Sequence, residues 1–224
     1  MSSKKRDEII TAGARVFARL GYHSTTVKDV IGEAGVARAT FYAYFSDKRE
    51  LFLEIASGRT TEIVRILTAG IDSIIEQFEA EGAPTPDPAV LQVVLSDLIE
   101  GIFRYVRKNR GITNIFLHQM IGMDKGFTRV FNDYQEALID QAERLVENGI
   151  RIGAMNETDC RMAAEFIISG HMYLARSFSA GSGSYNVEEM SRQFTGYQLR
   201  GLLGEAPVTP GNRKKAKEVL TGRR

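Results

Sequence analysis

The sequence has one cysteine, three histidines and no long apolar run. The single cysteine, Cys160, excludes an internal disulfide framework, and so few Cys and His side chains argue against a structural zinc site. No apolar stretch reaches the roughly 18 residues of a membrane span. Asp7 and Glu8 follow the first basic residues where a signal peptide would become apolar. We therefore expect a cytoplasmic protein with no metal, no cofactor and no contact with a membrane.

Strand-like alternation of apolar and polar residues is also missing, and no segment repeats at a fixed period. Apolar residues recur instead at steps of three and four, which is typical of amphipathic helices. The sequence predicts an all-α fold with an N-terminal three-helix helix-turn-helix domain, which a fourth helix joins to a helical bundle. We expect the first domain at residues 1–47, the bundle at 48–204 and a basic, mobile tail at 205–224.

The N-terminal helices are bounded by clear signals. A first helix is expected over residues 4–20, followed by Gly21 as its cap. Thr26 and Asp29 form a capping box at the start of the second helix, and Gly35 supplies the turn before a third helix at 37–44. A second capping box, Asp47 with Glu50, opens the fourth helix, and Phe41 and Phe45 are expected in the core. This spacing predicts a helix-turn-helix.

Later boundaries are set by proline, glycine and asparagine. Residues 81–88 hold three of the five prolines and read as a loop, with Asp87 and Pro88 starting the next helix. Gly122 and Gly126 are expected to bracket a break before a long helix. Residues 147–157 turn the chain into a helix at 159–178. A Gly/Ser loop then leads, through a capping box of Asn186 and Glu189, to a last helix at 187–204.

The third helix has the residues that DNA recognition needs. Arg38, near its N-terminus, can donate two hydrogen bonds to guanine, and the small Ala37 and Ala39 allow close approach. Hydroxyls suited to phosphate oxygens are carried by Thr26, Thr40, Tyr42 and Tyr44, and Lys48 adds a positive charge at a helix start. Residues 1–50 hold nine Lys and Arg against six Asp and Glu, a net charge of +3. The alternative is that Tyr42 and Tyr44 pack at a protein interface.

The stretch resembles the DNA-binding domain of the TetR family of bacterial transcriptional regulators. AGARVFARLGY, TTVKDVIGEAGV and ATFYAYFSDKRELF carry the resemblance, over roughly residues 8–54. It implies phosphate contacts and base contacts at Thr26, Lys28, Ala37, Arg38, Ala39, Thr40, Tyr42, Tyr44 and Lys48. The sequence departs from the family pattern at Ala37, where Ser is common, and this change removes a helix cap. Arg38 occupies a position that varies in the family, so its base preference does not carry over.

The resemblance also implies a homodimer joined by the last two long helices. In this sequence those helices offer the following interface candidates: Phe166, Gly170, Leu174, Phe178, Phe194 and Tyr197. The alternative is that these side chains close the core of the single chain. A two-fold dimer would bind a pseudo-palindromic operator, with half-sites in successive major grooves.

The middle helices would form an effector pocket. Candidates for its wall are Ile99, Phe103, Phe116, Met120, Phe131, Tyr134 and His171. Such pockets are mostly apolar with few polar anchors, and Met suits a pliable wall. His171, His118 and Glu100 are possible anchors, although each also fits a core or a satisfied polar position. We expect a small apolar or amphipathic effector, with long-chain acyl compounds as one option.

Sequence features of an enzyme are missing. The chain has no paired Glu-x-x-His site, no Gly-rich phosphate loop and no nucleophile elbow. We therefore expect a ligand-responsive, DNA-binding transcriptional regulator, most simply a homodimeric repressor that a small effector releases from its operator. The alternative is a regulator that acts as an activator, or through protein partners without a small effector.

Overall fold

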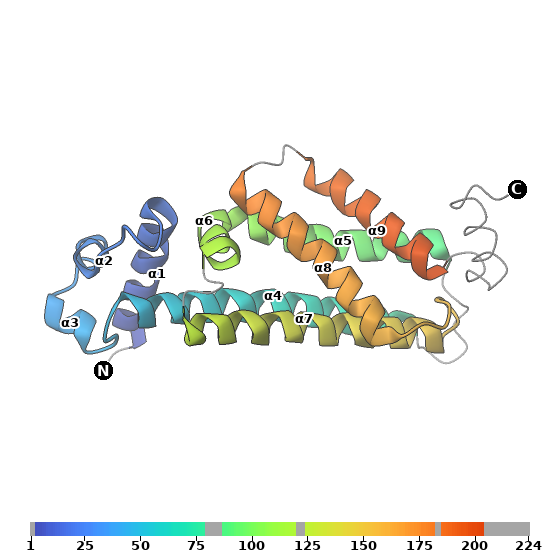
Figure 1. The fold of residues 1–224 in the computed structure, drawn as a ribbon, viewed down its shortest axis with the longest axis horizontal. Helices are drawn as coiled ribbons and strands as arrows, with labels where there is room; N and C mark the ends of the chain where they lie inside the picture. Colours follow the sequence, from blue (N-terminus) through green and yellow to red (C-terminus); the bar gives the residue numbers. More distant parts are fainter. Residues whose placement is uncertain (1–2, 79–86, 120–123, 182–184, 204–224) are drawn as a thin grey trace, which may run out of the picture.

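The computed structural model describes residues 3–78, 87–119, 124–181 and 185–203, and this part of the chain is helical without a strand. The N-terminal helices are α1 (Ser3–Leu20), α2 (Val27–Ala34) and α3 (Arg38–Tyr42). They lie at one end of the elongated molecule, and α4 (Lys48–Phe78) runs from them along its length (Figure 1). The all-α fold expected from the sequence is confirmed.

The helix-turn-helix unit, residues 3–47, has an aromatic core. Phe17, Phe41 and Phe45 are almost completely buried, together with Phe52 from α4. The rings of Phe17 and Phe52 meet edge to face with their centroids 4.9 Å apart, a preferred aromatic geometry. The prediction that Phe41 and Phe45 belong to the core is confirmed.

The two capping boxes of this unit differ. At α2, the Thr26 hydroxyl accepts from the Asp29 N–H and the Asp29 carboxylate accepts from the Thr26 N–H, as predicted. Gly35 then ends α2 with φ of +62°, a conformation that favours glycine. At α4, the Asp47 carboxylate accepts from the Glu50 N–H, but the Glu50 carboxylate accepts from the Ser46 N–H and hydroxyl, each at 2.7 Å. The predicted Asp47–Glu50 box was therefore right for the Asp47 side chain and wrong for the Glu50 side chain, which binds Ser46 instead.

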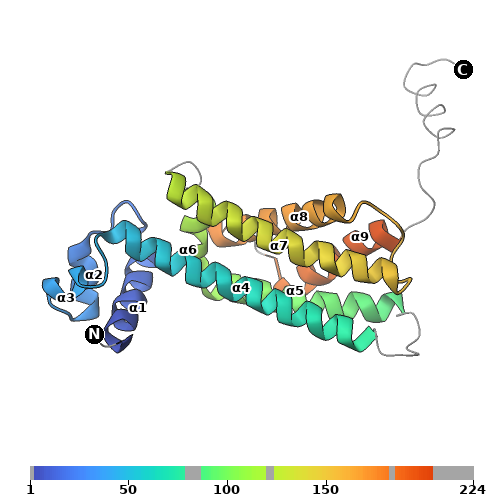
Figure 2. The ribbon, with the colours of Figure 1, turned by 90° about the horizontal axis from the view of Figure 1, so that it is seen from below.

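The remaining helices form a bundle around α4. They are α5 (Pro88–Lys108), α6 (Arg110–Asn114), the π-helical turn η1 (Ile115–Gln119), α7 (Lys125–Arg151), α8 (Cys160–Ala180) and α9 (Val187–Leu203). Figures 1 and 2 show α4 and α7 side by side and running in the same direction, and α8 packs on α7 while α9 packs on α5. Ion pairs join α4 to α7 near both ends, Arg49 to Asp124 and Asp72 to Arg144.

Several predicted boundaries moved. Gly126 lies in the first turn of α7 instead of at a break, because the Asp124 carboxylate caps that helix by accepting from the N–H groups of Gly126 and Phe127. The helix then continues to Arg151, so the first five residues of the predicted turn are helical. Asp87 caps α5, with Pro88 as its first residue, as predicted. Gly122, most of the proline-containing loop and the predicted tail lie outside the described residues.

The bundle also touches α1 directly. Gly111, in α6, lies against Ala18, and a Cβ atom at residue 111 would approach the Ala18 Cβ to 2.6 Å. Only glycine allows this close approach without a shift of the two helices. The helix-turn-helix unit is therefore held to the bundle at α6 as well as through α4.

Candidate nucleic-acid interface

The outer face of α3 carries the side chains that the sequence assigns to base contacts. Phe41 points into the core, which leaves Ala37, Arg38 and Ala39 exposed on the other side of this short helix. Ala37 precedes the helix with φ of −70° and ψ of 151° and makes no side-chain cap. The surface is small and unobstructed, as a helix entering a major groove requires.

Arg38 is held against a tyrosine. Its guanidinium carbon lies 5.5 Å from the centroid of the Tyr42 ring, one helical turn away, and the Tyr42 side chain is 45% exposed. Such a cation–π contact limits the conformations of a long side chain while leaving its N–H groups free to donate. Within the described residues, no carboxylate pairs with Arg38.

The predicted phosphate contacts have different surroundings. Lys28 and Thr26 are exposed at the start of α2, but the Thr26 hydroxyl donates to the Asp29 carboxylate at 2.6 Å. That carboxylate has a pKa below its usual range, because it accepts hydrogen bonds from the Thr26 side chain and backbone. Thr40 and Tyr44 are half-buried.

Lys48 makes contacts that its sequence position did not predict. Its ammonium group donates to the backbone carbonyls of Tyr22, His23 and Thr25, at 2.9, 3.0 and 2.7 Å. It also lies 4.9 Å from the centroid of the Tyr22 ring. In this structure Lys48 thus holds the loop between α1 and α2, and a phosphate contact by Lys48 stays a prediction.

Ion pairs occupy much of the basic excess of the N-terminal region. Arg6 pairs with Glu54 at 3.0 Å, Arg19 with Glu33 at 3.3 Å and Arg49 with Asp124 at 2.7 Å. Arg38 and Lys28 remain exposed beside the outer face of α3 and the start of α2. The positive charge available to a phosphate backbone is therefore concentrated near Arg38 and Lys28.

An aromatic cluster joins this unit to the bundle. The ring of Tyr22, from the loop after α1, meets the rings of Phe52 in α4 and Phe127 in α7, with centroids 5.2 and 5.6 Å away. Arg49 binds both carboxylate oxygens of Asp124, at 2.7 and 2.8 Å, and its guanidinium lies 5.3 Å from the Phe127 ring. The beginnings of α4 and α7 thus contact the helix-turn-helix unit together.

A mostly apolar cavity lies farther along α4 and α7, with a volume of about 80 Å³. Four of the predicted pocket residues line it: Ile99, Phe103, Tyr134 and His171. Phe116 and Phe131 do not, since their rings contact one another with centroids 5.8 Å apart, and Met120 lies outside the described residues. The wall also includes Ile63, Leu67 and Ile71 of α4, which were not among the predicted residues although their four-residue spacing marks one buried helix face.

Two of the described residues that line this cavity are polar, Tyr134 and His171. Burial raises the pKa of the Tyr134 hydroxyl above its usual range. Burial lowers the pKa of His171 to about 4, against the opposing effect of a hydrogen bond to the Ile167 carbonyl. Both side chains are therefore uncharged at neutral pH.

An exposed apolar face runs along α8 and α9. Phe166 is 77% exposed, Tyr173 73% and Tyr197 64%. Gly170, Leu174 and Phe194 are partly exposed, and Gly170 gives room to the Phe194 ring, which a Cβ at residue 170 would approach to 2.4 Å. We call Phe166, Tyr173 and Tyr197 the α8/α9 face.

Phe178 does not belong to this face. Its side chain is 9% exposed, and its ring packs on Phe103 with centroids 5.7 Å apart. In the single chain Phe178 packs in the core, as the alternative expected, and its role at an interface stays a prediction. Tyr173 was missed, although it follows Phe166 by seven residues and so shares its side of the helix.

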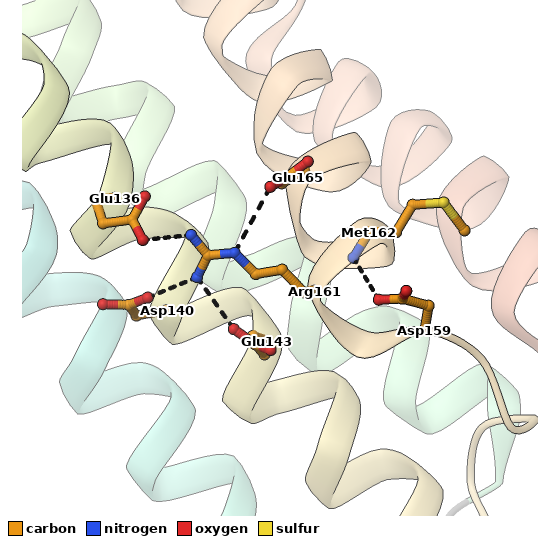
Figure 3. Close-up of polar contacts among 7 residues, drawn as sticks. All are labelled: Glu136, Asp140, Glu143, Asp159, Arg161, Met162 and Glu165. Carbon is orange, nitrogen blue, oxygen red and sulfur yellow. Dashed lines mark hydrogen bonds and ion pairs between the residues drawn. The ribbon is translucent and has the colours of Figure 1, made fainter.

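Behind this face, ion pairs fix α8 to α7. Figure 3 shows the Arg161 guanidinium surrounded by Glu136, Asp140 and Glu143 of α7 and Glu165 of α8. The Asp140 and Glu143 oxygens lie 2.8 and 3.1 Å from Nη1. Hydrogen bonds to these carboxylates raise the pKa of Arg161 above its usual range. They hold the N-terminal half of α8 in a fixed position on α7.

The helix-turn-helix unit with an exposed third helix defines a DNA-binding protein. No helix within the described ranges is long and apolar enough to cross a bilayer. Residues 9–55 match a family model described as bacterial regulatory proteins, tetR family. Residues 9–55 are therefore a helix-turn-helix domain of the TetR family, and KstR2, a relative over most of the chain, is a transcriptional repressor.

Known proteins resemble the chain over different lengths. The HTH-type transcriptional regulator YfiR of Bacillus subtilis is 31% identical over 99 residues, which are 44% of this chain but only 43% of YfiR. The HTH-type transcriptional repressor KstR2 of Rhodococcus jostii is 22% identical over 89% of this chain and 92% of its own. FadR from Bacillus subtilis, solved in complex with stearoyl-CoA, shares the fold with a TM-score of 0.69 at 18% identity, over 88% of this chain and 99% of that one.

Proposed function

We propose that the protein is a homodimeric repressor that a small apolar or amphipathic effector releases from a pseudo-palindromic operator. The observation that carries this proposal is that α4 and α7 wall the apolar cavity, while their first turns contact the helix-turn-helix unit. A ligand that separates the cavity walls would therefore move the part of the molecule that meets DNA. This regulator acts in the cytoplasm, where the operator is.

The size of the cavity supports a coupled mechanism. At about 80 Å³ it is several times smaller than pockets that bury a typical small ligand, roughly 300–1,000 Å³. An effector of ordinary size must widen it by moving α5, α7 or α8 relative to α4. The widened state is then the one that binds effector, and by linkage the effector weakens operator binding by the same factor by which the operator weakens effector binding.

The α8/α9 face supports the dimer. Exposed aromatic side chains are the residue type enriched in protein interfaces, and Phe166, Tyr173 and Tyr197 are together on the two last helices. A two-fold dimer on this face would offer two α3 helices to an operator whose half-sites lie one turn of DNA apart, about 34 Å. The contacts proposed for operator binding are Ala37, Arg38 and Ala39 to bases, with Thr26, Lys28 and Tyr42 among those to phosphate.

The apolar wall supports an effector with a hydrocarbon portion. The FadR relative of similar fold was solved with stearoyl-CoA, a long-chain acyl compound. The walls here offer Ile, Leu, Val and Phe side chains from α4, α5, α7 and α8. We therefore include acyl compounds and other long hydrocarbons with a polar end in the candidate class.

The test measures operator affinity with and without ligand. Footprinting on the DNA upstream of the gene supplies the operator, and fluorescence anisotropy follows its release by a panel of acyl-CoA thioesters, fatty acids and long-chain alcohols. The matched variant is Ala142→Leu, which fills the cavity from α7, where Ala142 is 5% exposed. It should bind operator like the wild type and no longer respond to ligand.

Two outcomes would contradict this proposal. Equal operator affinity for free and ligand-saturated wild type would remove the effector mechanism and favour a regulator that works through protein partners. An unchanged ligand response in Ala142→Leu would place the effector outside this cavity.

A further inference from the structure

His171 is the one imidazole on the cavity wall, and its hydrogen bonding fixes where its proton lies. Nδ1 is 2.8 Å from the backbone carbonyl oxygen of Ile167, one turn back along α8. A carbonyl oxygen accepts but cannot donate, so Nδ1 must carry the hydrogen. In the neutral ring Nε2 is then a bare lone pair, able to accept and unable to donate.

This lone pair has no partner within the described part of the chain. Nε2 is fully buried, and no donor there reaches it. The ring is instead surrounded by aromatic carbon, with the Phe103 and Phe194 centroids 6.2 and 5.0 Å from its own. Buried polar atoms are nearly always hydrogen-bonded, and one that is not lowers stability unless another group supplies the bond. The ring borders the cavity, which provides a place for such a group.

The rest of the wall restricts which group that is. Apart from Tyr134 and His171, every lining side chain among the described residues is aliphatic or aromatic hydrocarbon or the thioether of Met172. In the part of the chain that the structure describes, no Lys or Arg lines the cavity to pair with an anion, and an unpaired charge buried there would be strongly disfavoured. A carboxylate would also offer only acceptors to an atom that is itself an acceptor.

We infer that the effector is a largely hydrocarbon molecule whose uncharged hydroxyl or amide N–H donates a hydrogen bond to His171 Nε2 inside the cavity. This inference rests on the proposed function, because it takes the cavity as the effector site. It narrows the candidate class from any amphipathic molecule to those with a neutral donor at the buried end. The neutral state of His171 near pH 7 agrees with it.

The first experiment compares two constitutional isomers, 1-decanol and methyl nonyl ether. They have the same heavy-atom count, but only the alcohol donates a hydrogen bond. Calorimetric titration of the full-length protein should give about tenfold tighter binding of the alcohol, the worth of one hydrogen bond. His171→Phe keeps an aromatic ring at this position, removes the acceptor and should bind both isomers alike. Met172→Leu, a change elsewhere in the wall, should leave the ratio of the two affinities unchanged.

The second experiment reads the tautomer directly. Nitrogen-15 NMR of histidine-labelled protein, with His171→Phe assigning the signals, should show Nδ1 protonated and Nε2 unprotonated. Addition of 1-decanol should shift the Nε2 signal, and the ether should not. A protonated Nε2 in the free protein would overturn the inference.

The outcomes separate this inference from the proposed function. Equal binding of the isomers to the wild type, tighter binding of decanoate, or a preference that persists in His171→Phe would overturn the inference and leave the cavity as the effector site. Failure of the alcohols, the ether, the fatty acids and the acyl-CoA thioesters of the panel to bind would overturn both.

Discussion

Lys48 donates to three backbone carbonyls of one loop, from residues 22, 23 and 25. An ammonium group in that position offsets the partial negative charge of oxygens that no helix satisfies. These contacts hold the loop between α1 and α2, so any effect that they have on DNA binding would be indirect. A phosphate contact would require Lys48 to give up at least one of these bonds.

Replacement of Lys48 by Gln should lower the free energy of unfolding by about 2 kcal/mol, since hydrogen bonds to a charged group are lost. Urea titration measures this loss, and hydrogen exchange should rise at residues 22–25. Lys28→Gln is the matched control: Lys28 is exposed, so stability should hold while operator affinity falls. Unchanged stability in Lys48→Gln, with a salt dependence of binding reduced by about one phosphate contact, would instead support the phosphate role.

Arg38 is the candidate for base recognition. Arg38→Ala should relax the preference at one base pair of each half-site by about 1–3 kcal/mol and leave the other positions alone. Competition binding against operators changed one base pair at a time measures this. An equal loss of affinity for every sequence would show that Arg38 contacts the backbone.

His171 should make stability depend on pH. Its pKa is 6.5 in the unfolded chain and about 4 in the folded one, so protons bind preferentially to the unfolded state between these values. The contribution of neutral His171 to stability is therefore fully present above about pH 6.5 and is lost as the pH falls toward about 4. The free energy of unfolding should fall by at most about 3 kcal/mol over this range, at 1.36 kcal/mol per pKa unit. Between pH 7 and pH 4.5, the free energy of unfolding should fall by more in the wild type than in His171→Phe. Parallel falls would show that His171 is protonated in the folded protein.

At the scale of helices, α4 and α7 act as a parallel pair. Arg49 with Asp124 joins their beginnings and Asp72 with Arg144 joins them farther along. The cavity lies beside the segment between these two ion pairs, at Ile63, Leu67 and Ile71 of α4 and Tyr134, Leu138 and Ala142 of α7. Because ion pairs join α4 and α7 on both sides of this segment, a ligand that displaces the middle of the two helices should also displace their first turns.

Asp124→Asn tests this transmission with little change to helix α7 itself, because Asn caps a helix as well as Asp does. The variant loses the ion pair with Arg49. Without ligand, the variant should bind operator with an affinity within about twofold of the wild type. The factor by which the strongest ligand of the panel weakens operator binding should be about five times smaller in the variant than in the wild type. Anisotropy titrations with and without ligand measure both. A full ligand response in Asp124→Asn would move the coupling to α6 and its contact with Ala18.

At the scale of the whole molecule, the dimer proposed on the α8/α9 face would bring two helix-turn-helix units to the operator. The face is supported from behind, because Arg161 fixes α8 to α7 through carboxylates on both helices. A rigid face with exposed aromatic side chains is suited to a two-fold interface, in which each residue meets its own symmetry mate or a neighbour of it.

Phe166→Glu combined with Tyr197→Glu should convert the dimer to a folded monomer. Both side chains are exposed, so helix content and unfolding should hold, while light scattering after gel filtration reports half the mass. Affinity for the full operator should fall about 100-fold or more, because the second half-site no longer binds intramolecularly. Val93→Glu, at a 60% exposed position on α5, is the control for added charge and should remain dimeric. A dimer that survives the double change would place the interface elsewhere.

Local signals in the sequence were enough for most helices and for the N-terminal core. Caps at Thr26 and Asp87 are contacts between near neighbours, and Phe41 and Phe45 face inward because of helical spacing alone. The long-range contacts were not predictable in this way. The partners of Lys48 are a loop 23 to 26 residues away, and the difference between buried Phe178 and exposed Tyr173 depends on where α5 packs. The π-helical turn Ile115–Gln119 likewise has no signal of its own in the sequence.

The pairing of two chains that we propose through the exposed aromatic residues of α8 and α9 would have a consequence for how the cell sets the level of repression. Pairing of two chains is second order in protein, so the paired fraction depends on abundance. Below the dissociation constant of the dimer, operator occupancy rises with the square of the amount of protein; above it, occupancy rises in proportion. Expression level thus becomes a control on transcription in its own right, acting through the same helices but independently of any ligand.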